Sequence, residues 1–105
     1  MMNKKEVVWH IKALLDYSEW QKEDIKKADK ITNFIIEILR NGVLNGTGKP
    51  EKLKARSGYS RRIDQYNRLV YGIEKESNKP YFVSCKGHYE NLKNILKRVE
   101  YIEFK

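Results

Sequence analysis

The chain has 105 residues, of which 40% are hydrophobic, enough for one small core and hence a single domain over residues 1–105. It contains no run of about 18 apolar residues for a membrane span and no apolar signal region at its start, so we expect a cytoplasmic protein that does not bind membranes. Cys85 is the only cysteine and the two histidines lie far apart, which gives neither a disulfide nor a zinc-ligand pattern. We therefore predict no metal and no cofactor.

The charge of the chain points to a polyanionic partner. The net charge is +8 and the sequence pI is about 9.6, values that favour nucleic acid binding. Residues 46–70 carry seven basic and two acidic side chains, and so hold five of the eight net charges. We expect nucleic acid to contact this stretch.

The first forty residues have the pattern of a short strand followed by two helices. Residues 7–9 suit a strand, and residues 11–20 predict an amphipathic helix, with Ile11, Leu14 and Leu15 on its apolar side and Lys12, Asp16 and Glu19 on its polar side. A second helix is expected over residues 24–41, because apolar side chains recur there at steps of three and four. Gly42 is its stop signal.

A glycine-rich loop and three strands are expected next. Residues 41–58 hold four of the six glycines, which predicts a long surface loop. Strand candidates rich in aromatic or β-branched residues follow, as in an antiparallel meander: residues 59–64, 68–74 and 81–86. Because side chains alternate along a strand, Arg61 and Arg62 point to opposite faces and cannot have the same role.

The last part of the chain predicts one more helix. Four apolar residues have the i, i+3, i+4, i+7 spacing of a helix: Leu92, Ile95, Leu96 and Val99. This helix would lie in a C-terminal extension over residues 90–105.

Several separated groups of residues together resemble one known family. They are Trp9, Tyr17, Trp20 and Gln21; Gly48, Lys49, Pro50, Glu51 and Leu53; Ser60, Arg61, Arg62 and Ile63; Arg68, Leu69, Val70 and Tyr71; and finally His88 and Tyr89. In order and spacing, this set resembles the YoeB/Txe branch of the RelE toxin superfamily over residues 7–89. The resemblance implies an α+β, RelE-like fold in which two N-terminal helices pack on a twisted, mainly antiparallel β-sheet. The C-terminal helix would be an addition to that plan.

The resemblance also implies an activity and partners. Members of that family are toxins of type II toxin–antitoxin systems that cleave messenger RNA in the ribosomal A site and inhibit translation. It therefore implies mRNA, the ribosome and a cognate antitoxin as partners, while a homodimer is left open. The apolar stripe in residues 92–99 could pack on the domain, form a dimer surface or contact the antitoxin.

All of the family's catalytic residues have counterparts here, namely a glutamate, two phosphate-directed arginines and a terminal histidine–tyrosine pair: Glu51, Arg62, Arg68, His88 and Tyr89. The chain departs from the family pattern at Asn67, where relatives often have histidine. It also departs in the extension beyond Tyr89, where family chains usually stop.

The chemistry of RNA cleavage suits this set of side chains. RNA carries its own nucleophile, the 2′-hydroxyl, so an enzyme needs a base, an acid and cations for the developing negative charge, without a metal. We assign Glu51 as general base and His88 as general acid, because histidine exchanges protons near neutral pH. Arg62 and Arg68 can present paired donors to phosphate oxygens.

Further contacts to RNA are assigned to residues around this set. Tyr89 could stack on a base or donate a hydrogen bond to phosphate. Four basic residues are assigned to RNA binding: Lys49, Lys52, Lys54 and Arg61. Arg61 is also open to a structural interpretation, because one of the three arginines Arg61, Arg62 and Arg68 could solvate the sheet face or pair with a carboxylate and not contact RNA.

Two other functions remain open from the sequence. One is a non-catalytic basic module that binds nucleic acid through phosphate contacts and weakens steeply with salt. The other is a ribonuclease of the same fold that cuts free RNA without the ribosome. We interpret four large aromatic residues as core or interface residues: Trp9, Trp20, Phe34 and Tyr71. We assign no function to His10 and Cys85.

Overall fold

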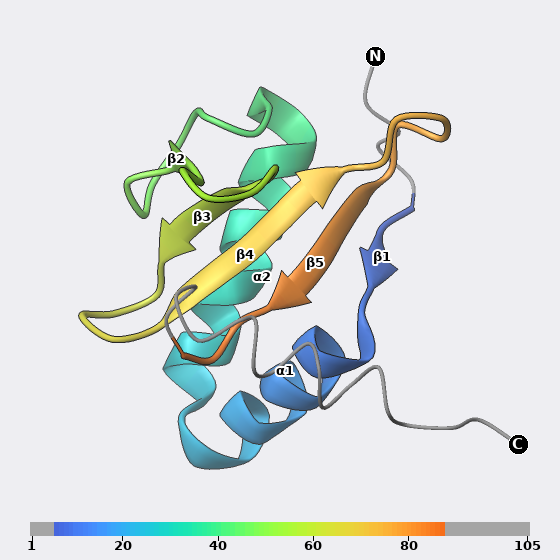
Figure 1. Cartoon of the computed structure of the whole chain (residues 1–105). Coiled ribbons are helices and arrows are strands. Elements are labelled where there is room, and N and C mark those ends of the chain that lie inside the picture. Colours follow the sequence, from blue (N-terminus) through green and yellow to red (C-terminus); the bar gives the residue numbers. More distant parts are fainter. Residues whose placement is uncertain (1–5, 88–105) are drawn as a thin grey trace, which may run out of the picture.

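The computed structural model of the protein describes residues 6–87, which form two helices and a five-stranded sheet (Figure 1). In chain order the elements are β1 (Val8–Trp9), α1 (Ile11–Glu23), α2 (Ile25–Asn41), β2 (Glu51–Lys52), β3 (Tyr59–Arg62), β4 (Arg68–Ile73) and β5 (Pro80–Ser84). The predicted α+β class with two N-terminal helices is confirmed. The predicted C-terminal helix lies outside the described residues.

The sheet is mixed, with the strand order β1-β5-β4-β3-β2. Three of its four strand pairings are antiparallel, and β1 pairs with β5 in parallel. The predicted mainly antiparallel sheet is therefore confirmed, with one parallel pair at its edge. Both helices lie on the same face of the sheet (Figure 1), and within residues 6–87 no helix covers the other face.

The second helix begins and ends where the sequence predicted. Asp24 precedes it, although the Asp24 side chain forms no capping hydrogen bond. Gly42 follows it with φ +92°, and its N–H donates to the Ile38 carbonyl at 3.0 Å. A residue with a side chain is strained in this left-handed conformation, so glycine is the natural end of the helix.

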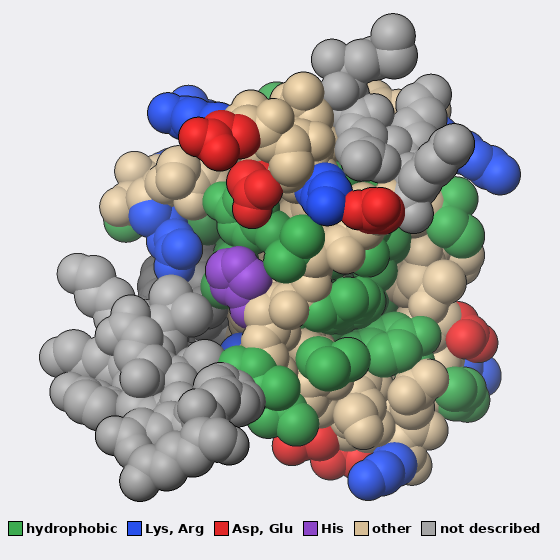
Figure 2. Space-filling model, turned by 90° about the vertical axis from the view of Figure 1, so that its right-hand side faces the viewer, with side chains coloured by type: hydrophobic (Ala, Val, Ile, Leu, Met, Phe, Trp, Pro, Cys, Tyr) green, Lys and Arg blue, Asp and Glu red, His purple; other side chains and the backbone are tan. Residues whose placement is uncertain are grey.

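The predicted orientation of the first helix is wrong. Its buried residues are Ala13, Asp16 and Trp20, whereas Leu14 and Leu15 are 48% and 51% exposed. Asp16, expected on the polar side, is buried because it accepts backbone hydrogen bonds from the chain that follows β5. Viewed from the β1 side, the surface shows a band of hydrophobic side chains with charged groups at its borders (Figure 2).

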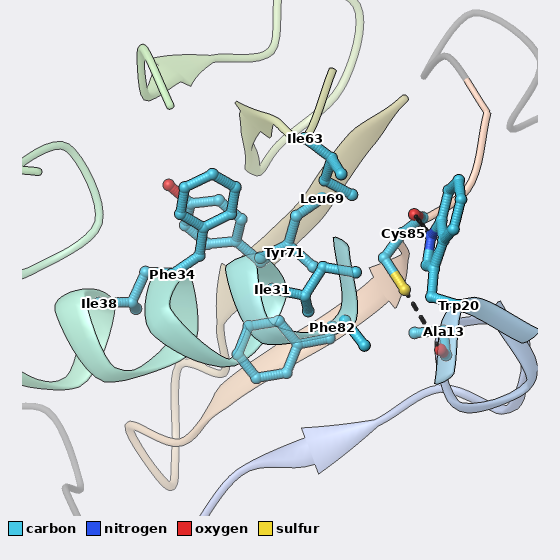
Figure 3. Close-up of a cluster of buried hydrophobic side chains, with 11 residues drawn as sticks. Ala13, Trp20, Ile31, Phe34, Ile38, Ile63, Leu69, Tyr71, Phe82 and Cys85 are labelled. Carbon is cyan, nitrogen blue, oxygen red and sulfur yellow. Dashed lines mark hydrogen bonds between the residues drawn. The ribbon is translucent and has the colours of Figure 1, made fainter. Parts of the chain in front are cut away.

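The main core lies between the helices and the sheet (Figure 3). Its buried members are Ala13, Trp20, Ala28, Ile31, Phe34, Ile38, Ile63, Leu69, Tyr71, Phe82 and Cys85. The predicted core role of Trp20, Phe34 and Tyr71 is thus confirmed, and Trp9 packs half-buried against the same cluster. Neither helix in residues 6–87 is long and apolar enough to cross a membrane.

Candidate active site

The sheet face turned away from the helices gathers three of the predicted catalytic residues. Glu51 of β2 is paired with Ser60 of β3, and Arg62 of β3 is paired with Arg68 of β4. Directly opposed residues of antiparallel strands project to the same side, as do residues two apart in one strand. Glu51, Arg62 and Arg68 therefore share one face, separated along the strands by a step of about 7 Å.

The two arginines differ in how tightly they are held. Arg62 is exposed, while Arg68 is only 9% exposed. One terminal nitrogen of Arg68, Nη1, donates to the backbone carbonyls of Asp64 and Asn67 at 2.8 and 3.1 Å. Within residues 6–87 all side-chain hydrogen bonds of Arg68 run through Nη1, so Nε and Nη2 are left for a phosphate.

The turn between β3 and β4 is organised by one carboxylate. Asp64 Oδ1 accepts the backbone N–H groups of Tyr66 and Asn67, each at 2.7 Å, and Asp64 forms an ion pair with Lys27 of α2. Burial alone would raise the pKa of Asp64, but the hydrogen bonds from Lys27 and Asn67 outweigh it and hold that pKa well below its usual range. The turn that carries Arg68 is thereby fixed to the helical layer.

The loop before Glu51 packs closely against the rest of the fold at Gly48. Gly48 has φ +81°, and a Cβ built there would lie 2.6 Å from the ring of Phe34, so no other residue fits without displacing the core. The Gly48 carbonyl accepts the backbone N–H of Arg62 at 2.7 Å. This contact sets the register in which β2 meets β3, and therefore the place of Glu51.

A small pocket opens beside Glu51. It has a volume of about 120 Å³ and is lined by Glu51, Lys52, Leu53 and Lys54. Leu53 is 5% exposed and packs against Val70 and Val83 on the open face. The Glu51 side chain is exposed, and none of the ion pairs in the described part of the chain includes it. Its carboxylate is therefore available to a substrate.

The predicted RNA-binding lysines lie close to Glu51 in the chain, and two of them, Lys52 and Lys54, line this pocket. Lys49, Lys52 and Lys54 are all exposed. Lys52 is paired with Tyr59, so by strand alternation it points away from the face that carries Glu51. The three lysines thus place exposed positive charge in β2 and next to it, and Lys52 does not share the face of the arginine pair.

Arg61, which the sequence placed among the RNA contacts, is a structural residue here. Its side chain is 0% exposed. It forms an ion pair with Glu37 of α2 at 2.8 Å and donates to the carbonyls of Thr47 and Asn45 at 3.1 and 2.7 Å. Its Nε also donates to the hydroxyl of Tyr71 at 2.9 Å. The guanidinium holds the glycine-rich loop against the helices, as the alternative interpretation expected, and is not accessible to RNA.

Gly87, which precedes His88 in the sequence, is hydrogen-bonded to Asn67 and Arg68. The backbone N–H of Arg68 donates to the Gly87 carbonyl at 3.1 Å, and the Gly87 N–H donates to Asn67 Oδ1 at 2.8 Å. His88 and Tyr89 follow directly in the sequence but lie outside the described residues. Over the part that is described, the structure brings together Glu51, Arg62 and Arg68.

Two residues that support this site could not be recognised from the sequence. Asn67 stands out only as a departure from the family pattern, and the amphipathic pattern of α1 predicts Asp16 on the solvent side. Neither has a local sequence signal, because their hydrogen-bond partners lie 20 and 69 or 70 residues away along the chain. In residues 6–87 no group of three or more His, Cys, Asp or Glu side chains is arranged to hold a metal ion.

Comparison with known proteins identifies the family. Residues 9–89 match the family described as the YoeB-like toxin of bacterial type II toxin-antitoxin system. The chain belongs to the YoeB toxin family. Toxin YoeB of Synechocystis sp. (strain ATCC 27184 / PCC 6803 / Kazusa) is 41% identical over 87 residues, covering 81% of this chain and 92% of the relative. Toxin YoeB of Escherichia coli (strain K12) is 38% identical over 85 residues, covering 79% and 98%.

Solved YoeB structures share the fold. The YoeB dimer from Staphylococcus aureus has 40% sequence identity and a TM-score of 0.74, and the match covers 83% of this chain and all of that one (100%). The heterotetrameric YoeB-YefM toxin-antitoxin complex from the same organism has 41% identity and a TM-score of 0.71, with 85% and 99% covered. The family match includes every residue assigned to the candidate site, His88 and Tyr89 among them.

Proposed function

We propose that this YoeB-family protein is an endoribonuclease that cleaves mRNA in the ribosomal A site, without a metal, and so inhibits translation. The observation that supports it is the strand register, which puts an exposed carboxylate and two arginines on one sheet face, the one turned away from α1 and α2. The chain just before His88 lies next to Arg68, because the backbone N–H of Arg68 donates to the Gly87 carbonyl. A base, an acid and paired cations are the groups that this reaction needs.

The reaction is a transfer of the phosphate ester within the RNA. Glu51 takes the proton of the 2′-hydroxyl, and the 2′-oxygen attacks the adjacent phosphorus. The bond from phosphorus to the 5′-oxygen breaks, and His88 gives its proton to that leaving oxygen. Arg62 and Arg68 bind the phosphate oxygens and stabilise the charge that develops on them. The products are a 2′,3′-cyclic phosphate and a fragment with a 5′-hydroxyl.

The remaining assignments concern RNA binding. Tyr89 stacks on a base or donates to a phosphate, and the exposed Lys49, Lys52 and Lys54 hold the RNA backbone around the site. Contacts between surface lysines and phosphates supply binding affinity, and salt cations compete with them for the phosphates. Substitution of these lysines should therefore reduce the affinity for RNA more than the rate of cleavage. Arg61 has no place in this set because it is buried.

We infer that an antitoxin controls this activity in the cytoplasm. S. aureus YoeB has been solved both as a dimer and in complex with YefM, and those assemblies support an antitoxin partner and a homodimer for this chain. An acidic segment that is disordered until it binds would complement the positive stretch of residues 46–70. Covering this stretch would also cover Glu51.

Primer-extension mapping of a translated message with purified 70S ribosomes tests the proposal. The natural protein should produce cuts in the A site, whereas Glu51→Gln and His88→Ala should produce none. Glu76→Gln, an exposed carboxylate in the β4–β5 turn, is the matched control and should cut normally. Cutting of free RNA at the same rate would assign the ribosome-independent activity, and binding of RNA without cutting by any version would assign the non-catalytic module.

A further inference from the structure

Residues 85–87 are held by side chains from two separate elements. Strand β5 ends at Ser84, so the backbone of these three residues lies beyond the sheet's last strand. Asp16 of α1 binds the N–H groups of Cys85 and Lys86, and Asn67 of the β3–β4 turn binds the N–H of Gly87. Three consecutive backbone donors are thus each bound by a side chain.

Asp16 fixes the first two of these residues to the helical layer. Asp16 is 4% exposed, and its Oδ2 accepts the N–H groups of Cys85 and Lys86 at 3.0 and 3.1 Å. The other oxygen is paired with Lys12, which also donates to the Lys86 carbonyl at 3.4 Å. A carboxylate is costly to bury unless its hydrogen bonds are made, so these contacts account for an acidic residue on the buried side of α1.

Asn67 uses both ends of its side-chain amide. Oδ1 accepts the Gly87 N–H at 2.8 Å, while Nδ2 donates to both oxygens of Asp64 at 3.0 and 2.9 Å. Asp64 is itself paired with Lys27 of α2. The next residue, Arg68, donates its backbone N–H to the Gly87 carbonyl. The donor and the acceptor of Gly87 are thus both held by the turn that carries a phosphate-directed arginine.

Gly87 has the backbone conformation that such a connection requires. Its φ is +98°, in the region that favours glycine, and a Cβ built there meets nothing within 4 Å. Its lack of a side chain therefore reflects backbone conformation and not a shortage of space. From this residue the chain continues directly to His88.

We propose that Asp16 and Asn67 are positioning residues, which hold residues 85–87 against α1 and beside Arg68 and so fix the backbone to which His88 is joined in the sequence. This inference rests on the proposed function, in which His88 gives a proton to the 5′-oxygen. A misplacement of about 1 Å by a change outside the reacting groups can cost about 100-fold in rate. Loss of the hydrogen bonds of Asp16 or of Asn67 to residues 85–87 should therefore slow proton donation and leave RNA binding unchanged.

The test compares two synthetic mRNAs in single-turnover cleavage on 70S ribosomes. One has the natural 5′-oxygen at the cleavage site, and the other has sulfur in its place. A thiolate leaves without being protonated, so cleavage of the sulfur substrate does not depend on a general acid. Asn67→Ala and Asp16→Ala should cut the oxygen substrate about 10- to 100-fold more slowly than the natural protein, with half-saturating concentrations unchanged. On the sulfur substrate this deficit should disappear.

Conservative variants and a structural control sharpen the result. Asp16→Asn keeps an oxygen for the two N–H groups, and Asn67→His keeps one nitrogen to accept and one to donate; both should cut the oxygen substrate at nearly the natural rate. Thr47→Val removes the hydrogen bonds that the Thr47 hydroxyl forms with Glu37, near the C-terminal end of α2, and this variant should treat the two substrates alike. If Asp16→Ala fails to fold, Asn67→Ala carries the test alone.

The outcomes separate this inference from the function beneath it. Equal deficits of Asn67→Ala on both substrates, or no deficit on either, would overturn the positioning role. If sulfur restores His88→Ala but not Asn67→Ala, the general acid stands and the positioning role falls. A His88→Ala variant that sulfur does not restore, or a natural protein that cuts neither substrate, would overturn the proposed function, and the positioning role with it.

Discussion

Replacing Arg61 with alanine is expected to destabilise the fold strongly. The arginine is fully buried, and its removal leaves the Tyr71 hydroxyl and the carbonyls of Asn45 and Thr47 without this donor and the Glu37 carboxylate without its cation. Removing one partner of a buried ion pair costs about 3–5 kcal/mol. Because the Glu37 side chain is 25% exposed and water can reach it, we take the lower end, about 3 kcal/mol. For a domain of this size that is a fall in Tm of about 12–24 °C.

The neighbouring residue supplies the control. Arg62 is exposed, so Arg62→Ala should change Tm by less than about 4 °C while abolishing cleavage, because a phosphate ligand is lost. Arg61→Lys keeps the charge but cannot reproduce the five hydrogen bonds of the guanidinium, and it should fall between the two. Thermal unfolding followed by circular dichroism measures all three. An Arg61→Ala protein that melts within a few degrees of the natural one would refute this account of the buried arginine.

Three further predictions concern stability and reactivity. Gly48→Ala should lower Tm and cleavage together, since its Cβ would lie 2.6 Å from the ring of Phe34; an unchanged protein by both measures would contradict the close packing of the loop at Gly48. Asp64 has a depressed pKa, so it stabilises the fold above its ordinary value of 3.8, and this contribution is lost as pH falls below that value. The Tm advantage of the natural protein over Asp64→Asn should therefore shrink in acid, and an advantage independent of pH would exclude this linkage. Cys85 is 0% exposed and burial raises the pKa of its thiol, so iodoacetamide should modify it only as fast as the native protein unfolds; rapid labelling of the folded protein would contradict its burial.

Local pattern was sufficient for much of the fold. The stripe of α2 and the stop at Gly42 follow from the spacing of apolar residues and from the conformational freedom of glycine. Strand alternation separated Arg61 from Arg62, and the structure shows one buried and the other exposed. These features depend on residues close together in the chain, so a single sequence is enough to find them.

Contacts between residues far apart in the chain could not be predicted from the sequence. Strand β2 has two residues in a glycine-rich loop, too short for any periodicity, yet its pairing with β3 places Glu51. The parallel pairing of β1 with β5 joins residues more than 70 positions apart. Asp16 looked like a solvent-facing residue of an amphipathic helix, because its hydrogen-bond partners follow β5 and only the tertiary fold brings them to α1. Hydrophobic pattern alone does not identify a buried carboxylate.

The chemistry of the cut ends is the most direct test of the central claim, that Glu51, the arginine pair and His88 cleave RNA through its own 2′-hydroxyl. A short mRNA on programmed 70S ribosomes would be cleaved by the natural protein and both new ends identified by mass spectrometry, beside the same mRNA with one 2′-deoxy nucleotide at the cleavage position. We predict a 2′,3′-cyclic phosphate, a 5′-hydroxyl and no cleavage of the deoxy substrate. A 3′-hydroxyl with a 5′-phosphate, or equal cleavage of the deoxy substrate, would contradict the account.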